Sequence, residues 1–397
     1  MSNRLVQLEL FHLCLPFRRW FSRSPGRSTK TDTVLVAALL ANGTVGWGEG
    51  LPQSKVTGET VESVFFNIKD TLADCLKQTE PESFPQLLDL ADKLPFTNSQ
   101  GQIIHTARCC VELALLDAYG KYFGRPLSSI SEWLGFGGFL GDGSINKIRV
   151  SGVLDGSIGP ARLAHQFRLM RWYGLRDFKL EMGFQHDIEN LQLVYRHLRP
   201  RLERQQASLR VDAGGAWDID TATAMCEKLV DYDVCCVEQP LDTADHSHLH
   251  TLASLSPIPL MADESLISLN DGRFLAENDF IDFFNIRISK NGGLLPALRL
   301  AELAAKHFLG GQLGALPGES GILTAAERHF LQMVPNIDFT ETAYATFSLR
   351  KDIVDRKMRF GYGGKLDILD RSGLGIGLRR KNLGKFVIGL PGKIHLT

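Results

Sequence analysis

The sequence predicts an α/β barrel of the (β/α)7β, TIM-like kind with an α+β domain in front of it. Three observations predict this architecture. Apolar segments alternate with helical patterns over about 200 residues, acidic residues close three successive segments, and the opening residues alternate as antiparallel strands do. A chain of 397 residues, 44% of them hydrophobic, can bury the cores of two domains.

The N-terminal region should begin with strands at 4–14 and 33–49, the second interrupted by an Asn-Gly hairpin turn. The loop between them, PFRRWFSRSPGRSTKT, interleaves Arg18 and other basic residues with the aromatic Trp20. It is either a solvated surface loop or a lid that meets an anionic substrate.

A helical region follows from 59 to about 123, where GQIIHTARCCVELALLDAYGKYFG carries one continuous apolar face. The glycine-rich stretch at 134–143 marks the joint to the barrel. It lacks a complete GxGxxG and follows a helix instead of a strand, so it does not predict a dinucleotide site.

Strands and helices alternate after residue 146, as a βα barrel requires. The tail, containing LDILDRSGLGIGL and KFVIGL, returns to β character, and we expect it to pack on the N-terminal domain. The predicted barrel strands are 147–153, 176–182, 208–212, 234–238, 258–263, 281–288, 311–316 and 337–341.

The bulk composition favours a small-molecule partner. Lys+Arg 44 against Asp+Glu 45 leaves a formal charge of −1, so no basic field would recruit nucleic acid or an anionic membrane. Seven cysteines without CxxC spacing indicate free thiols in a reducing compartment. Without a signal-peptide pattern or a run of about 18 apolar residues, the sequence predicts a cytoplasmic protein.

Acidic residues recur about every 25 residues through the middle of the chain, the length of one βα unit. Asp212, Glu238 and Asp263 each close an apolar run, and Lys179 and Lys290 lie in similar positions on either side. In a barrel all five would converge on one rim. Three carboxylates gathered there would repel, so we expect a divalent metal, Mg²⁺ or Mn²⁺, bound by Asp212, Glu238 and Asp263.

Such a metal would make the carbon beside a bound carboxylate acidic by stabilising the enediolate that proton removal creates. A base is then needed beside that carbon. Lys290 is placed for this role, because a nearby divalent cation lowers the pKa of a lysine. Glu264, directly after Asp263, could hydrogen-bond the ammonium of Lys290.

Several motifs, in order along nearly the whole chain, carry a resemblance to the enolase superfamily. GWGEGLP and VTGET resemble a capping-domain lid loop, VELALLDAYGKYFGRPL a long cap helix, and SKNGG the lysine motif of the sixth strand. LPGES, with Glu319, and FTET, with Glu341, are similar to later family segments. The closest likeness is to the muconate-lactonizing subgroup, which includes muconate cycloisomerases, o-succinylbenzoate synthases and dipeptide epimerases.

The resemblance implies a capping domain at 1–130 with lid loops, a barrel with a Mg²⁺ site at 131–365, and a tail at 366–397 that returns to the cap. It also implies an even-numbered homo-oligomer. The groups that would meet a carboxylate substrate are Thr57, Arg18, Trp20, Glu319 and Glu341. For Glu319 and Glu341, a purely structural role is the alternative to contact with the substrate.

The sequence departs from the family pattern at the second barrel strand, where Lys-x-Lys is replaced by Lys179-Leu180-Glu181. Period-two alternation points Lys179 and Glu181 to the same side of the strand. Three roles for Glu181 remain open: it acts as a carboxylate base, it forms a salt bridge with Lys179, or its presence indicates that the family's usual reaction has been lost. The family's Asp-x-Asn is likewise altered, with Gly214 in place of the asparagine.

With one of the two usual lysines absent, the sequence favours proton transfer on one face of the substrate. We predict a Mg²⁺-dependent cycloisomerase or lyase acting on a carboxylic acid, with catalytic residues Lys290, Lys179 and Glu181 and with Lys290 as the principal acid/base. The alternatives are a racemase or epimerase that uses Glu181 and Lys290, and a non-catalytic ligand-binding barrel that has lost turnover.

Overall fold

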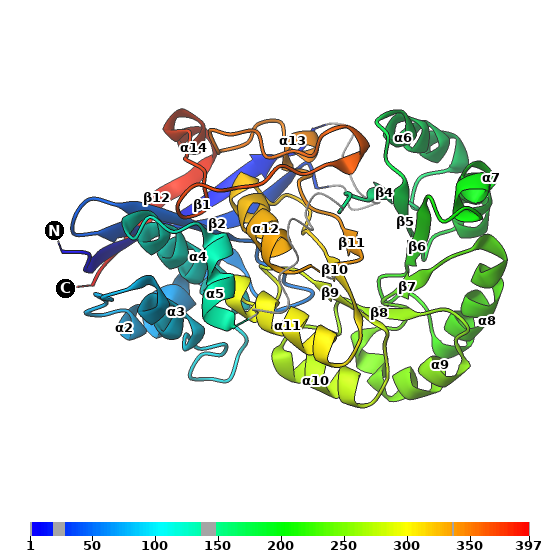
Figure 1. Cartoon of the computed structure of the whole chain (residues 1–397), viewed down its shortest axis with the longest axis horizontal. Coiled ribbons are helices and arrows are strands. Elements are labelled where there is room, and N and C mark those ends of the chain that lie inside the picture. The colour runs from blue at the N-terminus through cyan, green and yellow to red at the C-terminus, as the bar shows by residue number, and fades with distance from the viewer. Residues whose placement is uncertain (1, 19–27, 136–147, 336, 397) are drawn as a thin grey trace.

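The computed structural model describes residues 2–18, 28–135, 148–335 and 337–396. It contains a small antiparallel sheet with helices packed on it and, beside this, a ring of parallel strands surrounded by helices (Figure 1). The predicted fold class is confirmed. Trp20, which the sequence predicted to meet the substrate, and most of the glycine-rich joint lie outside the described residues.

The antiparallel sheet of the cap has the order β12-β1-β2-β3, so the C-terminal strand completes the N-terminal domain as predicted. Gln7 pairs with His395, and a turn around Asn42, whose side chain accepts from the Thr44 N–H, joins β2 to β3. The strands are β1 (Leu5–Pro16), β2 (Lys30–Leu40), β3 (Val45–Gly50) and β12 (Val387–His395).

Glycines on β3 let the long helix α4 (His105–Tyr122) lie directly against the sheet. A Cβ at Gly46 would lie 2.1 Å from the backbone nitrogen of Ala118, and one at Gly48 would lie 2.0 Å from the carbonyl oxygen of Cys110. No side chain fits at those distances, so the alternating glycines of VGWGEG are required by this packing.

The other cap helices lie around α4, and two begin at side-chain caps: Thr60 caps α1 and Ser83 caps α3. A π-helical turn joins α1 to α2. The elements are α1 (Val61–Asn67), the π-helix (Ile68–Leu72), α2 (Ala73–Cys75), α3 (Phe84–Asp92) and α5 (Ile130–Leu134).

In the part of the chain that the structure describes, eight parallel strands alternate with seven helices in the order predicted. A parallel bridge between Val150 and Thr340 connects the first strand region to the last, and the Ser151 N–H donates to the Thr340 carbonyl at 2.8 Å. The strands are β4 (Gly152–Leu154), β5 (Asp177–Glu181), β6 (Ser208–Asp212), β7 (Cys236–Glu238), β8 (Leu260–Ala262), β9 (Phe283–Ile286), β10 (Gly310–Leu313) and β11 (Phe339–Thr340).

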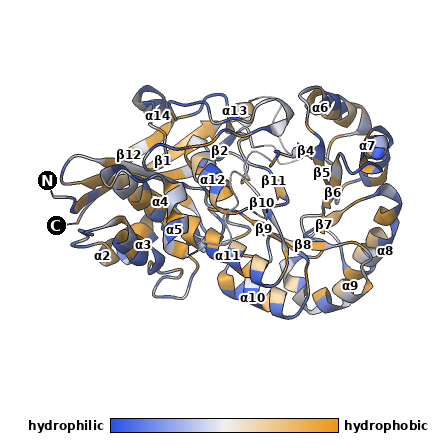
Figure 2. Ribbon diagram, in the orientation of Figure 1, coloured by the Kyte–Doolittle hydropathy of each residue, from blue (hydrophilic) through white to orange (hydrophobic). Residues whose placement is uncertain are grey.

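The barrel helices lie outside the strand ring, and Figure 2 shows hydrophobic and hydrophilic residues interspersed along the outermost ones, such as α8, α9 and α10. These helices bury their apolar faces against strands that are themselves apolar on the outer side. They are α6 (Pro160–Trp172), α7 (Asp187–Leu202), α8 (Ile219–Leu229), α9 (Leu249–Leu255), α10 (Leu269–Glu277), α11 (Leu294–Lys306) and α12 (Gly321–Met333), followed by α13 (Ala345–Ser348) and α14 (Arg380–Phe386).

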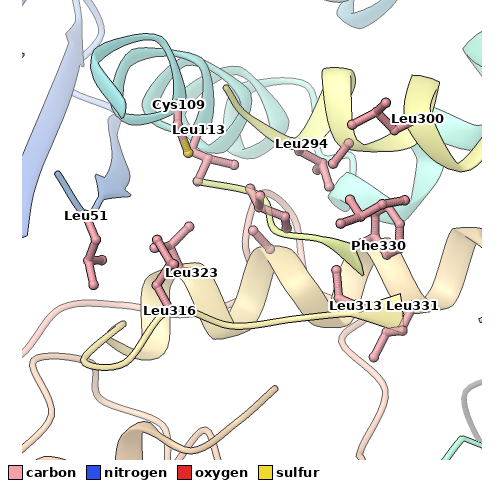
Figure 3. Packing of buried hydrophobic residues seen from close by; sticks show 14 of the residues in the cluster. Leu51, Cys109, Leu113, Leu294, Leu300, Leu313, Leu316, Leu323, Phe330 and Leu331 are labelled. Atoms are coloured by element: carbon pink, nitrogen blue, oxygen red, sulfur yellow. The ribbon is translucent and has the colours of Figure 1, made fainter. Parts of the chain in front are cut away.

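The cap and the barrel share a hydrophobic core. Leu113 of α4, Leu294 of α11 and Leu323 of α12 are fully buried, and Figure 3 shows these three helices meeting around them. Among the described residues, no helix combines the length and apolar character needed to cross a bilayer. The domain limits at 130 and 365 and the cytoplasmic location stay predictions.

Candidate active site at the carboxyl ends of the barrel strands

The three predicted acidic residues lie side by side at the carboxyl ends of neighbouring strands. Asp212 ends β6 and Glu238 ends β7, and the two are paired across the sheet. Asp263 directly follows β8, the next strand in the ring. The carboxyl ends of barrel strands are where enzymes of this architecture place their catalytic groups.

Lys179 lies among the acids, as the sequence predicted. Its buried ammonium Nζ is 3.0 Å from Asp212 Oδ2, 2.9 Å from Glu238 Oε2 and 2.8 Å from Glu341 Oε2. Glu341 also accepts from the Arg210 guanidinium at 3.1 Å. The predicted site residue Glu341 therefore belongs to the same group of charges as the strand-end acids.

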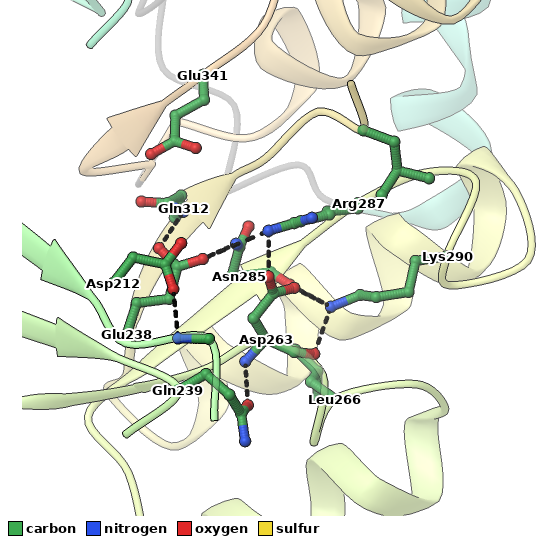
Figure 4. A network of polar contacts seen from close by, with 12 residues as sticks. Asp212, Glu238, Gln239, Asp263, Leu266, Asn285, Arg287, Lys290, Gln312 and Glu341 are labelled. Atoms are coloured by element: carbon green, nitrogen blue, oxygen red, sulfur yellow. Dashed lines mark hydrogen bonds and ion pairs between the residues drawn. The ribbon is translucent and has the colours of Figure 1, made fainter. Parts of the chain in front are cut away.

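Arg287 is the most important residue that the sequence analysis missed. Its Nη2 contacts Asp263 Oδ2 and lies 3.4 Å from Glu238 Oε1, so the guanidinium lies between two of the acids (Figure 4). Its position follows from strand alternation, because Asn285 and Arg287 are two residues apart and face the same side. That periodicity was a readable signal in the segment FFNIRISK.

Glu238 is the centre of the network, because four side chains donate to it. Besides Lys179 and Arg287, Asn285 Nδ2 donates to Oε1 at 2.6 Å and Gln312 Nε2 donates to Oε2 at 3.0 Å. Asn285 and Gln312 were not predicted as site residues. We call the charged strand-end groups the rim cluster. They are Lys179, Asp212, Glu238, Asp263, Arg287, Lys290 and Glu341.

Lys290 holds the loop after β9 against Asp263. Its Nζ donates to the Asp263 carbonyl at 2.6 Å, to Asp263 Oδ1 at 2.8 Å and to the Asn285 carbonyl at 3.0 Å (Figure 4). From the cap, His105 of α4 approaches the Lys290 carbonyl, with its Nδ1 at 2.9 Å. All three N–H bonds of the ammonium are therefore directed at protein acceptors.

Burial and neighbouring charge set the ionisation of these groups. Burial alone would raise the pKa of Glu238, but the charges of Lys179 and Arg287 lower it to about 2. Burial would lower the pKa of Lys179, but Asp212, Glu238 and Glu341 raise it well above its ordinary value. Burial lowers the pKa of Lys290, although Asp263 opposes this shift. Glu238 and Lys179 are thus a charged pair.

Glu181 ends β5 in register with Asp212 and is partly exposed. Phe178 packs outward against Phe167 of α6, whereas Lys179 points inward to the rim cluster. Alternation then directs Glu181 to the same inner side as Lys179. The role of Glu181 in the site stays a prediction.

Glu264 does not form the hydrogen bond to Lys290 that the sequence suggested. Its Oε2 is buried without a hydrogen-bond partner among the described residues, and burial together with the charge of Asp263 raises its pKa to about 7. Lys290 instead bonds to Asp263 and Asn285.

The other predicted substrate groups are not part of the rim cluster. Glu319 is buried before α12, where its Oε1 accepts from the Leu316 N–H and its pKa is raised by burial and by Glu327. Thr57 donates to the Gln53 carbonyl at 3.3 Å, and Arg18 donates through Nε to the Leu349 carbonyl at 2.9 Å. Their roles in binding substrate stay predictions.

The three acids do not, as arranged, present a set of free oxygens to a metal ion. Asp212 Oδ1 accepts from the Gly214 N–H, and every other carboxylate oxygen of Asp212, Glu238 and Asp263 accepts from the side chains named above. Within the described ranges no group of three or more His, Cys, Asp or Glu residues is arranged to hold a metal. The positive charges that contact these acids in the structure are those of Lys179, Arg287 and Lys290.

Family models match most of the chain. Residues 162–382 match the family described as "Enolase C-terminal domain-like", and residues 15–131 match "Mandelate racemase / muconate lactonizing enzyme, N-terminal domain". The chain therefore belongs to the enolase superfamily, in its mandelate racemase and muconate lactonizing subgroup, which confirms the predicted resemblance.

Individual relatives are isomerases of more than one kind. Muconate cycloisomerase 1 of Pseudomonas putida is 28% identical over 89% of this chain and 90% of that protein. The N-succinyl-L-Arg/Lys racemase of Bacillus cereus is 27% identical over 82% and 83%. The L-Ala-D/L-amino acid epimerase of a Maribacter species is 28% identical over 94% and 100%.

Solved structures agree with these relationships. The muconate lactonizing enzyme of Pseudomonas putida superposes with a TM-score of 0.79, at 27% identity over 97% of this chain and 99% of that one. The protein is thus an enzyme of the enolase superfamily. The relatives divide between cycloisomerases and racemases or epimerases, so they do not define its reaction.

Proposed function

We propose that the protein is a cycloisomerase or lyase that transfers a proton to or from the carbon beside the carboxylate of a small organic acid, on one face of the substrate. The observation that carries the proposal is the row of three cations, Lys179, Arg287 and Lys290, held among acids at the strand ends. Fixed positive charge at that place stabilises the negative charge that develops on the substrate carboxylate in the transition state.

Lys290 is the principal acid/base in this proposal. Its amine is buried next to Asp263, and a lysine that loses its proton readily is suited to take one from carbon. Because its three N–H bonds all meet protein acceptors, the role requires that the bound substrate displace one of these contacts. Lys179 contacts three carboxylates, which supports a role in charge stabilisation instead of proton transfer.

The second candidate is a racemase or epimerase in which Glu181 and Lys290 act on opposite faces. It is favoured by the position of Glu181 at the end of β5, on the same inner side as Lys179, and by the racemase and epimerase relatives. A glutamate can serve as a base where another enzyme uses lysine, provided that its carboxylate reaches the substrate proton.

Membership of the superfamily implies a divalent metal ion as the usual cofactor. The Mg²⁺ or Mn²⁺ predicted at Asp212, Glu238 and Asp263 stays a prediction, since those oxygens hold protein cations. No step of the proposed reaction is therefore assigned to a metal. The predicted homo-oligomer likewise stays a prediction.

The test is exchange of substrate hydrogen for deuterium in D₂O, followed by NMR with and without Mg²⁺. The panel takes its members from the relatives' names: muconate, N-succinyl-L-arginine, N-succinyl-L-lysine and L-Ala dipeptides. We expect one of these acids to exchange or to be converted, and Lys290→Met to abolish the reaction. Lys306→Met, which changes an exposed lysine of α11, is the matched control.

Glu181→Gln separates the two candidates. A one-face reaction keeps exchange in this variant and gives a ring-closed or eliminated product, whereas an epimerase loses inversion of the stereocentre. Full activity in Lys290→Met would remove the assignment of Lys290. Failure of every acid to exchange or react would refute the proposed function for these substrate classes.

A further inference from the structure

Arg287 reaches a place that the fold has left open for it. A Cβ at Gly314 would lie 2.4 Å from Asn285 Oδ1 and 3.0 Å from Arg287 Nε, so any larger residue at 314 would press on both side chains. The side chain of Arg287 is 13% exposed. A glycine at this position of the next strand segment therefore gives Asn285 and Arg287 room to turn toward the rim cluster.

The guanidinium occupies the oxygens that a divalent ion would need. Its Nη2 contacts Asp263 Oδ2 and lies 3.4 Å from Glu238 Oε1. A metal bound between these acids would use the same lone pairs, and it would also repel the positive charge of Arg287 at short range. The guanidinium and the ion cannot both hold these oxygens.

Only part of the guanidinium is committed to the acids. Arg287 Nε is buried and has no hydrogen-bond partner among the described residues. An unpaired, buried N–H is costly. The guanidinium thus neutralises two acids through Nη2 and leaves Nε unpaired among the described residues.

We propose that Arg287 is a built-in competitor of divalent metal at Asp263 and Glu238, supplying from the protein itself the positive charge at this position. Metal binding then requires the Arg287–Asp263 contact to break. The inference concerns the resting site and does not rest on the reaction proposed above. If no acid in the substrate panel exchanges, it still stands or falls on metal binding alone.

Binding of Mn²⁺ tests the proposal directly, because its EPR signal reports the free ion. The full-length protein is dialysed against EDTA and titrated as wild type, Arg287→Met and Arg299→Met. Losing a charge-assisted hydrogen bond that competes for the site should raise Mn²⁺ affinity of Arg287→Met by about tenfold to a hundredfold. Arg299, on α11, pairs with Asp92 and Glu302 away from the rim cluster, so its variant should bind as the wild type does.

Equal or weaker Mn²⁺ binding by folded Arg287→Met would overturn the proposal. If that variant does not fold, Arg287→Gln takes its place, because a glutamine keeps a hydrogen-bond donor near the acids but removes the positive charge. It should also bind Mn²⁺ more tightly than the wild type, and equal or weaker binding would overturn the proposal. Thermal unfolding gives a second readout: Mn²⁺ should raise the Tm of the Arg287 variant that folds more than that of the wild type.

Discussion

Two sets of buried carboxylates in this protein differ in their hydrogen-bond partners. Those of the rim cluster accept mainly from side chains of other strands. The carboxylates of the second set, which we call the helix-capping carboxylates, all accept from backbone N–H groups at helix N-termini, and Glu49 and Glu112 accept from a side chain as well. The helix-capping carboxylates are Glu49, Glu59 and Glu112.

The kind of donor that holds a buried carboxylate indicates whether its role is structural or catalytic. Glu49 accepts from the Ser320 and Leu323 N–H groups at the start of α12, which uses the positive end of that helix. Backbone donors are fixed by the fold and cannot be exchanged for a substrate. Side-chain donors such as Lys179 and Arg287 can be rearranged when a ligand enters. A buried carboxylate is therefore a better candidate for catalysis when side chains hold it.

The largest effect should come from Glu238→Gln in the rim cluster. The substitution keeps the size of the side chain but removes the charge that faces Lys179 and Arg287. We expect exchange or turnover of the best substrate to fall by about 10³-fold, as for loss of a main electrostatic group in a site. The rate is measured by NMR in D₂O.

The matched control for this change is Glu302→Gln, which removes a charge on α11 outside the cluster. It should leave the rate within about twofold, since surface ion pairs contribute little. Folding of Glu238→Gln is checked by circular dichroism. If Glu238→Gln folded and kept its activity, hydrogen bonds from side chains would not identify the carboxylates that take part in the reaction.

Glu112→Ala should act on stability instead. Glu112 pairs with the buried guanidinium of Arg108 and accepts from the Leu295 N–H at the start of α11. Removing it leaves Arg108 buried without its charge partner, which costs about 3–5 kcal/mol in free energy of unfolding. Urea denaturation measures the loss. The rate per folded molecule should change little. A loss of rate without a loss of stability would contradict the assignment of the helix-capping carboxylates to structure alone.

The sequence predicted the barrel strands because each carries its own local signal, an apolar run closed by an acid or a turn. β6 was predicted with its observed ends, and Asp212, Glu238 and Asp263 gather as their spacing required. The packing of β3 on α4 was not predictable in this way. The alternating glycines of VGWGEG were visible, but the helix that requires them lies about 60 residues further along, and long-range packing leaves no local pattern.

Arg287 was missed for a related reason. Lys290, three residues later, was the more familiar base, and both residues follow the last hydrogen-bonded residue of β9. The turn after β9, where the Asn291 N–H donates to the Arg287 carbonyl, directs Lys290 onto the backbone of Asp263. How each of these two cations meets Asp263 thus depends on tertiary structure, although strand alternation from Asn285 already placed Arg287 on the inner side.

His329 provides a pH test outside the rim cluster. Burial lowers its pKa from 6.5 to about 4, and its Nδ1 accepts from the Ser128 N–H. A base with a lowered folded-state pKa stabilises the protein fully above pH 6.5, and this stability is lost as the pH falls toward 4. The loss from this residue should reach about 3 kcal/mol, since each pKa unit corresponds to about 1.4 kcal/mol.

The measurement compares urea unfolding of the wild type and His329→Gln at pH 7 and pH 4.5. The difference between them should shrink or reverse at the lower pH, because glutamine does not take up a proton. His307→Gln, at the partly exposed C-cap of α11, is the control and should follow the wild type. A pH-independent difference would show that His329 does not titrate in this range.

The smallest effect should come from Glu59→Gln among the helix-capping carboxylates. Glu59 accepts from the Thr106 and Ala107 N–H groups at the start of α4, and glutamine can still accept there with one oxygen. Only the interaction of the full charge with the helix dipole is lost, and the cost of burying that charge, which raises the pKa of Glu59, offsets part of this interaction. We expect a loss of about 1 kcal/mol in urea denaturation, with no change in rate.

Glu62→Gln is the exposed counterpart, since Glu62 lies in the first turn of α1 and should change stability less than Glu59 does. A loss of rate in Glu59→Gln at unchanged stability would be the informative failure. It would mean that the position of the α4 N-terminus affects the rim cluster through His105, which contacts the Lys290 carbonyl. Helix-capping carboxylates would then influence the reaction indirectly, through the helix that they cap, and the two sets would differ only in their distance from the substrate.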